Sequence, residues 1–165
     1  MRAAPIGAFF FDNLKKAASE AELSAEITHS HIEGKAGAMA VAVAAAIAAS
    51  RPYPIGNDFL KAVTPYVPEG KTKSGIELAM QIPSDALFDA MRQLGAGEKV
   101  SAQDTVPFCL WSAAHHLDNY ESALWNTAKG LGDVDTTCAI VGGIVALSAH
   151  HIPDTWLKRR EPLKL

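Results

Sequence analysis

Apolar residues along this 165-residue chain recur mostly three or four positions apart, which is the spacing of one helix face. No run alternates convincingly with a period of two, so the pattern predicts helices and no strands. Capping residues before the apolar runs and Pro or Gly after them mark the helix ends. The predicted helices cover residues 11–23, 26–50, 57–63, 74–82, 84–94, 104–117, 119–130 and 135–149, and a short one lies in the frayed tail 153–165.

The two longest apolar runs, residues 37–49 and 138–147, predict helices of the protein core. Both are shorter than the ~20 residues that a membrane-spanning helix needs, so we expect no membrane partner. Within the first run, alanines recur every four residues and form a smooth ridge that lets another backbone come close. These alanines are Ala36, Ala40, Ala44 and Ala48.

Length and composition predict a single domain over residues 1–165. Hydrophobic residues make up 48% of the chain and aromatic residues 7%, which favours closely packed helices. The formal charge of −3 gives no indication of a nucleic-acid partner. Cys109 and Cys138 lie in apolar runs without a CxxC pair, so they indicate buried thiols of a cytoplasmic protein.

The run GDVDTT, residues 132–137, places two aspartates and two threonines directly before an apolar helix. One interpretation is an N-cap, in which a side-chain oxygen accepts hydrogen bonds from free backbone N–H groups. Two aspartates and two threonines exceed what one cap needs. The other interpretation is a site for a hard cation such as Mg²⁺, with Asp133, Asp135 and Thr136 aiming oxygens at one point.

Several other features have simpler interpretations. Gly142 and Gly143 lower helix propensity by ~1 kcal/mol each, so we expect them to allow close approach of a neighbour, for which the alanine ridge is a candidate. Residues 95–105 read as a linker and as the most mobile segment. Pro107 is expected in the first turn of its helix, where a missing N–H does little harm.

Other polar and aromatic residues are expected to have structural roles. Glu33 could be functional, but a helix-entry or surface carboxylate is the simpler interpretation. His29 and His31 diverge on a helix, which disfavours a zinc pair. The histidine pairs at 115–116 and 150–151 are expected as cations near helix ends. The tryptophans are expected to pack the core or its rim, and these are Trp111, Trp125 and Trp156.

Three segments resemble the ADP-ribosylglycohydrolases, the family that includes the dinitrogenase reductase-activating glycohydrolase and the crystallin J1 relatives. GLGDVDTTCAIVGGIVAL resembles the C-terminal metal motif of that family. ITHSHIEGKAGAMAVAVAAAIA resembles its Thr-His-x-x-x-x-Gly segment, which leads into an Ala-rich helix, and MRAAPIGAFF resembles the end of its substrate loop. The three matches occur in the family's order and cover most of the chain.

The resemblance implies an all-α orthogonal multi-helix bundle with two Mg²⁺ or Mn²⁺ ions in a central cleft. It implies that Asp133, Asp135 and Thr136 are metal ligands and that His29 lines the ADP-ribose pocket. The implied reaction is hydrolysis of an ADP-ribosyl bond. The substrate would be an ADP-ribosylated protein or a small molecule that contains ADP-ribose.

The sequence also departs from the family. Family members are about twice as long, and their N-terminal half supplies further metal ligands in Gly-Asp and Thr-Asp-Asp motifs that we do not find here. We therefore expect an incomplete fold that corresponds to the C-terminal half, has an incomplete metal site and is inactive alone. We assign no catalytic residue. A separate chain that supplies the N-terminal half, or a homo-oligomer, could complete the metal site. The alternative is an inactive helical domain that self-associates through its exposed cleft.

Overall fold

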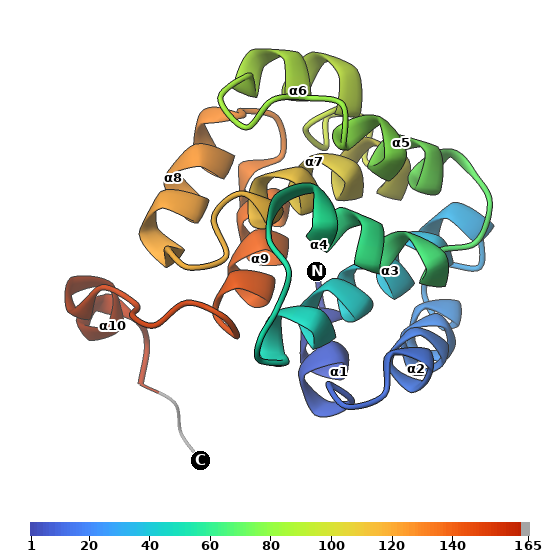
Figure 1. Cartoon of the computed structure of the whole chain (residues 1–165), viewed down its shortest axis with the longest axis horizontal. Coiled ribbons are helices and arrows are strands. Elements are labelled where there is room, and N and C mark those ends of the chain that lie inside the picture. The colour runs from blue at the N-terminus through green and yellow to red at the C-terminus, as the bar shows by residue number, and fades with distance from the viewer. Residues whose placement is uncertain (163–165) are drawn as a thin grey trace.

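The computed structural model describes residues 1–162, and within that range the chain is helical without a strand (Figure 1). The helices are α1 (Ala4–Phe9), α2 (Leu14–Glu26), α3 (Ile32–Ala49), α4 (Gly56–Val63), the 3₁₀ helix η1 (Thr64–Tyr66), α5 (Lys71–Ala79), α6 (Leu87–Leu94), α7 (Ala102–Ala114), α8 (Tyr120–Lys129), α9 (Val134–Val145) and α10 (Asp154–Arg159). The predicted all-α fold is confirmed. The last part of the expected frayed tail, residues 163–165, lies outside the described residues.

Helix α3 is the centre of the fold, and α1, α2, α4, α5, α7 and α9 all contact it. Its alanine-rich sequence suits this position, because alanine has the highest helix propensity and the smallest side chain that still packs. All four alanines of the predicted ridge are buried. Among residues 1–162, α3 is the one helix long and apolar enough to cross a membrane, yet 67% of it is buried inside the protein. This burial agrees with the prediction of a core helix.

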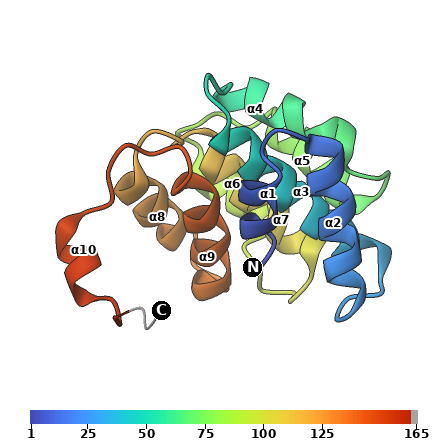
Figure 2. The same ribbon diagram turned by 90° about the horizontal axis from the view of Figure 1, so that it is seen from below.

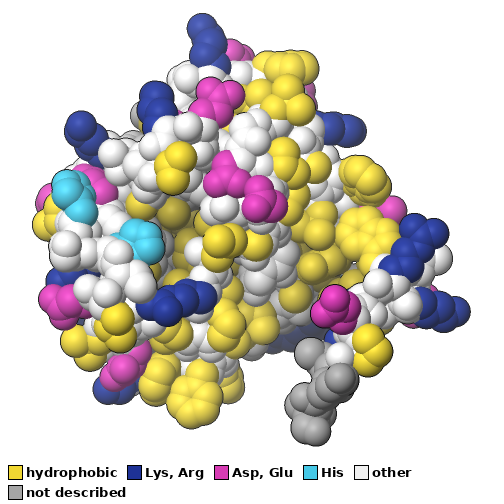
Figure 3. All heavy atoms as spheres, turned by 180° about the vertical axis from the view of Figure 1, so that it is seen from behind, with side chains coloured by type: hydrophobic (Ala, Val, Ile, Leu, Met, Phe, Trp, Pro, Cys, Tyr) yellow, Lys and Arg dark blue, Asp and Glu magenta, His cyan; other side chains and the backbone are white. Residues whose placement is uncertain are grey.

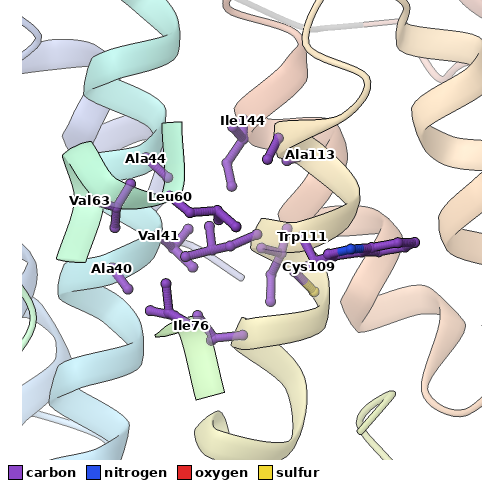
Figure 4. Packing of buried hydrophobic residues seen from close by; sticks show 14 of the residues in the cluster. Ala40, Val41, Ala44, Leu60, Val63, Ile76, Cys109, Trp111, Ala113 and Ile144 are labelled. Carbon is purple, nitrogen blue, oxygen red and sulfur yellow. The ribbon is translucent and has the colours of Figure 1, made fainter. Parts of the chain in front are cut away.

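The core lies between α3 and α7 and is filled from α4, α5 and α9 (Figure 4). Val41 of α3, Leu60 of α4 and Ile76 of α5 point toward one another in the space between α3 and α7, whereas the ring of Trp111 extends from α7 away from them (Figure 4). Trp111 is fully buried, and its indole N–H donates to the Ile82 carbonyl at 3.2 Å. The expectation that Trp111 packs the core is therefore confirmed, and the indole satisfies its one polar group there.

Helix α1 is a short element that the sequence pattern did not predict. Its six residues are mostly apolar or small all round, so they show no clear helical face. Gly7 lies directly on α3, where a Cβ at this position would stand 1.9 Å from the Ala42 carbonyl oxygen. Helix α1 is therefore held by backbone contact with the alanine-rich helix, which only the tertiary structure shows.

Several predicted helix boundaries are wrong. The predicted helix 26–50 begins at Ile32, because residues 27–31 form a turn in which the N–H groups of Thr28 and His29 both donate to the Ala25 carbonyl. The starts of α2, α4, α5 and α6 also differ by one to three residues from the predicted ones. Of these four helices only α2 begins with a side-chain cap, from Asn13, so capping residues in the sequence do not mark the starts of α4, α5 and α6.

Pro107 lies inside α7, in its second turn and not in the first turn as predicted. Its ring packs on α5, where a Cβ at Gly75 would lie 2.6 Å from Pro107 Cγ. The glycines of α9 allow close approach of neighbouring helices, as predicted, but the alanine ridge is not the neighbour. Gly142 faces Tyr120 of α8 and Gly143 faces Ala4 of α1, so neither lies on the alanine ridge.

The contact between α1 and α3 predicts that Gly7→Ala destabilises the fold by about 3 kcal/mol or more, because the added methyl group would overlap a backbone carbonyl. Gly142→Ala is the matched control. Its Cβ would lie 3.1 Å from the Tyr120 hydroxyl, which can move, and alanine raises helix propensity by ~1 kcal/mol. Urea denaturation measures both variants. Equal losses of unfolding free energy would contradict this account of α1.

Candidate metal centre and cleft

The acidic elbow, residues 132–136, forms the turn that leads into α9. Asp133 is the N-cap residue, and its Oδ1 accepts a hydrogen bond from the Thr136 N–H at 3.3 Å. N–H···O bonds mostly measure about 2.7–3.2 Å, so this cap is a weak one. Asp135 lies exposed in the first turn of α9. The cap interpretation therefore explains part of the role of Asp133 and does not explain why Asp135 is present.

The carboxyl groups of the acidic elbow lie together. The Thr136 and Asp135 side chains both lie within hydrogen-bonding reach of the Asp133 carboxylate, and these contacts hold the pKa of Asp133 below its ordinary value. When both carboxyl groups are ionised they repel each other, and a cation between them would offset that repulsion. The elbow thus gathers two carboxyl groups and one hydroxyl, which form an oxygen-only set of the kind that Mg²⁺ and Mn²⁺ prefer.

Asp133 and Thr136 line a cleft with a volume of about 340 Å³. His29, from the turn between α2 and α3, lines the same cleft, whereas Asp135 stands beside it without lining it. Figure 2 shows the N-terminus, this turn, the segment before α7 and the start of α9 at one end of the molecule. The face turned away from the viewer of Figure 1 carries acidic side chains near its middle, with histidines to one side (Figure 3).

The turn that carries His29 is shaped by Gly34, which lies in the first turn of α3. Thr28 Oγ1 lies 2.8 Å from His29 Nδ1, which orients the imidazole ring. A Cβ on Gly34 would lie 2.9 Å from the His29 Cβ, so glycine is what allows α3 to begin beside this histidine. His31 is the N-cap residue of α3, and its Nδ1 accepts from the Glu33 N–H at 3.2 Å. The structure therefore gives His29 and His31 separate positions and separate roles.

Residues 95–100, which we call the glycine loop, were expected to be part of a mobile linker. The structure places Ala96 and Gly97 in the interior, against the acidic elbow. The Asp133 N–H donates to the Ala96 carbonyl at 3.0 Å. In the sequence, Gly95 and Gly97 indicate that another segment could approach this loop closely. They do not indicate that this segment is the acidic elbow.

Glu33 is a buried carboxylate that serves two helices. It lies in the first turn of α3, as predicted, but it is 8% exposed and so is not a surface residue. Its oxygens accept from the N–H groups of Lys71 and Thr72 at 2.7 and 2.8 Å, and from the Thr72 hydroxyl at 2.7 Å. Burial works to raise the pKa of Glu33, but the hydrogen bonds from Thr72 and Lys71 outweigh it and leave this pKa lowered. Glu33 is therefore a structural carboxylate.

The remaining histidine and tryptophan predictions have mixed outcomes. His115 is the C-cap residue of α7, but burial lowers the pKa of both His115 and His116, which disfavours the predicted cations. Residues 150–151 lie between α9 and α10 and not at a helix end. Trp125 and Trp156 pack edge to face at the rim, as expected.

Both cysteines were predicted to be buried thiols, and one of them is fully buried while the other is half-buried. Cys109 is fully buried, and burial raises the pKa of its thiol. Cys138 is half-buried, and burial raises its pKa as well. Both are free thiols.

Comparison with known proteins assigns the chain to a family. The model of the ADP-ribosylglycohydrolase family matches residues 1–164. An uncharacterized protein from Archaeoglobus fulgidus is 31% identical over 160 residues, which cover 96% of this chain and 51% of that protein. This chain is a member of the ADP-ribosylglycohydrolase family, as its sequence motifs predicted. It spans about half the length of the archaeal relative.

The residues of the acidic elbow fit a hard divalent cation in kind but supply part of what it needs. Mg²⁺ takes about six oxygen ligands in near-octahedral geometry, and the elbow offers three side chains. Within residues 1–162, no group of three or more His, Cys, Asp or Glu side chains comes together to hold a metal. Other ligands would be water molecules or oxygens of another polypeptide segment.

The buried position of Glu33 predicts that Glu33→Gln destabilises the protein by about 1.5–3 kcal/mol at neutral pH, because an amide NH₂ would face an N–H donor. The pKa of Glu33 is lower in the folded protein than in the unfolded chain, where it is about 4.3. Its contribution is therefore complete above that pH and is lost as the pH falls through the lower folded value. Chemical denaturation between pH 3 and 7 measures the difference between the two proteins.

Glu77→Gln is the control, because Glu77 lies exposed on α5 and we expect its replacement to change stability by less than about 0.5 kcal/mol. A difference between the wild type and Glu33→Gln that stays constant down to pH 3 would show that the ionised form of Glu33 is not what stabilises α5.

Proposed function

We propose that this chain provides the C-terminal metal ligands and one wall of the substrate cleft of an ADP-ribosyl hydrolase that uses Mg²⁺ or Mn²⁺. Asp133, Asp135 and Thr136 would hold the ion, and His29 would border the ADP-ribose. The observation that carries the proposal is that Asp133 and Thr136 of the acidic elbow line the same cleft as His29, with Asp135 between them in the sequence. Membership of the family supports the class of reaction.

The size and lining of the cleft support a ligand of this kind. Its volume of about 340 Å³ lies within the range of about 300–1,000 Å³ that is typical of small-molecule sites. Small residues of α3 lie along it, among them Gly34, Gly37 and Ala38, so a ligand can approach the helix backbone. One wall of the cleft is formed by these small residues of α3, and the other carries the oxygens of Asp133 and Thr136. Together the two walls suit a ligand with both a flat ring and hydroxyl groups.

The reaction class defines what the residues must do. Hydrolysis of an ADP-ribosyl bond breaks the bond between the anomeric carbon and the acceptor atom, while water adds to that carbon and the acceptor takes up a proton. The transition state carries positive charge on the sugar, which nearby carboxylates stabilise. A divalent ion, when bound, would orient the ribose hydroxyls and polarise water. Asp133 and Asp135 place negative charge beside the cleft, and His29 offers a ring nitrogen to a sugar hydroxyl.

Three side chains do not complete the coordination of a binuclear centre, so we propose that the remaining ligands come from another polypeptide segment of the same family. The charge of the elbow would then hold one ion weakly in this chain alone. The alternative function is an inactive domain that self-associates. The exposure of Phe9 (78%) and Ile27 (84%) beside an apolar groove between α1 and α2 favours this alternative.

The proposal predicts that one Mn²⁺ binds per chain with a Kd on the order of 10⁻⁴ to 10⁻³ M, because two carboxylates and a hydroxyl form a site of low ligand number. Asp135→Asn removes one carboxylate and is expected to weaken binding at least tenfold. Isothermal titration calorimetry measures both proteins. Asp154→Asn is the matched control, because Asp154 is also an exposed first-turn carboxylate, on α10. Two tight sites per wild-type chain would contradict the incomplete site.

The proposal also predicts that the purified chain with Mg²⁺ does not hydrolyse ADP-ribosyl-arginine by itself, because the coordination is incomplete. Release of ADP-ribose is measured by chromatography, with Asp135→Asn as the comparison. Turnover that Asp135→Asn abolishes would confirm the hydrolase and refute the need for a second segment. Absent turnover, together with a dimer in light scattering and no Mn²⁺ binding, would favour the self-associating domain.

A further inference from the structure

The glycine loop and the acidic elbow fit together without spare room. Besides the hydrogen bond from the Asp133 N–H to the Ala96 carbonyl, two glycines bring the backbones into contact. A Cβ on Gly132 would lie 2.4 Å from the Ala96 carbonyl oxygen, and a Cβ on Gly97 would lie 2.8 Å from the Asp133 Cβ. Gly132 and Gly97 have φ values of +69° and +91°, which glycine adopts readily. The position of the loop therefore fixes the position of Asp133.

The glycine loop is in turn held by Asp104, in the first turn of α7. The Asp104 carboxylate is 7% exposed, and its Oδ2 accepts from the Lys99 N–H at 2.8 Å. Its main-chain carbonyl accepts from the Gly97 N–H at 3.0 Å. A Cβ on Gly95 would lie 2.3 Å from Asp104 Oδ1. One residue of a core helix thus contacts the loop at its start, its middle and its end.

Asp104 does not act as an ordinary helix-start carboxylate. Ser101, the N-cap residue of α7, makes no side-chain cap, and the Asp104 carboxylate bonds to the loop backbone and not to the N–H groups of α7. A carboxylate that served only the helix dipole would be free to stay in solvent. Burial of Asp104 is costly unless its hydrogen bonds are satisfied, so this carboxylate specifies the conformation of the loop.

The same loop also forms part of the cleft. Val100, at its end, lines the cleft with Ser101 and is 88% exposed. Val100 has a φ of +50°, which is rare for a β-branched residue, and its N–H donates to the Gly97 carbonyl at 3.1 Å. The surrounding hydrogen bonds hold this strained conformation. The loop therefore controls both Asp133 and the wall that carries Val100.

We propose that Asp104 is a positioning residue, which acts through residues 96–99 to hold Asp133 at the edge of the cleft and to keep the wall at Val100 in place. This inference rests on the proposed function for the role of Asp133 as a metal ligand. The chain of contacts runs from the core helix α7 through the glycine loop to the acidic elbow. The metal ligand thereby takes its position from the rigid core and not from the flexible turn in which it lies.

The test compares Asp104→Asn with Glu33→Gln. Both replace a buried carboxylate that accepts backbone N–H groups, but Glu33 serves α5 and does not contact the loop. Amide hydrogen exchange, resolved by NMR, is measured at Asp133 and at core residues of α3, and Mn²⁺ affinity is measured by calorimetry. For Asp104→Asn we expect exchange at Asp133 to accelerate about tenfold relative to the core, and Mn²⁺ binding to weaken severalfold. For Glu33→Gln we expect neither.

The readouts separate the two proposals. If the wild type binds no Mn²⁺, the proposed function fails, while exchange at Asp133 still decides whether Asp104 positions the elbow. If Asp104→Asn leaves exchange at Asp133 unchanged, or accelerates it no more than in the core, the positioning role is refuted. Should Asp104→Asn fail to fold, Gly97→Ala replaces it, because its Cβ would push against the Asp133 Cβ. The same local acceleration is expected, and its absence refutes the inference.

Discussion

Close contact between helix backbones around α3 is the constraint on which the structure depends. Alanine and glycine at the contact positions let α1 approach the carbonyl of Ala42, and let α5 and α7 meet where Gly75 faces Pro107. Backbones at such distances gain dispersion energy over their whole length of contact, and they tolerate no added methyl group. The helices therefore have one relative arrangement, and the cleft at their end has one shape.

The cleft lies where the ordered helices end and their connections meet. The turn before α3, the segment before α7 and the elbow before α9 come from distant parts of the sequence, yet they share one end of the molecule (Figure 2). Helix N-termini carry partial positive charge, which attracts acidic side chains such as those of Asp133 and Asp135 at the start of α9. The fold thus brings the oxygen-bearing side chains of Asp133 and Thr136 to this end of the molecule.

Two buried carboxylates show how the same chemistry serves different purposes. Glu33 bonds to the start of α5 and fastens one core helix to another, whereas Asp104 bonds to a loop that contacts the acidic elbow. The exposed carboxylate of Asp135 bonds to no such backbone group and remains beside the cleft. Burial and hydrogen-bond partners, and not residue type, distinguish structural carboxylates from those that are available to a ligand.

The sequence by itself determined the all-α fold, the core position of α3 and membership of the ADP-ribosylglycohydrolase family. These follow from helical periodicity, alanine content and motifs whose residues are adjacent in the chain. The ligand roles of Asp133, Asp135, Thr136 and His29 remain predictions. Only the tertiary structure revealed α1, the burial of Glu33 and the contact of the glycine loop with Asp133. Local patterns record which residues repeat along one element, whereas these contacts join elements far apart in the sequence, and packing alone decides which segments meet.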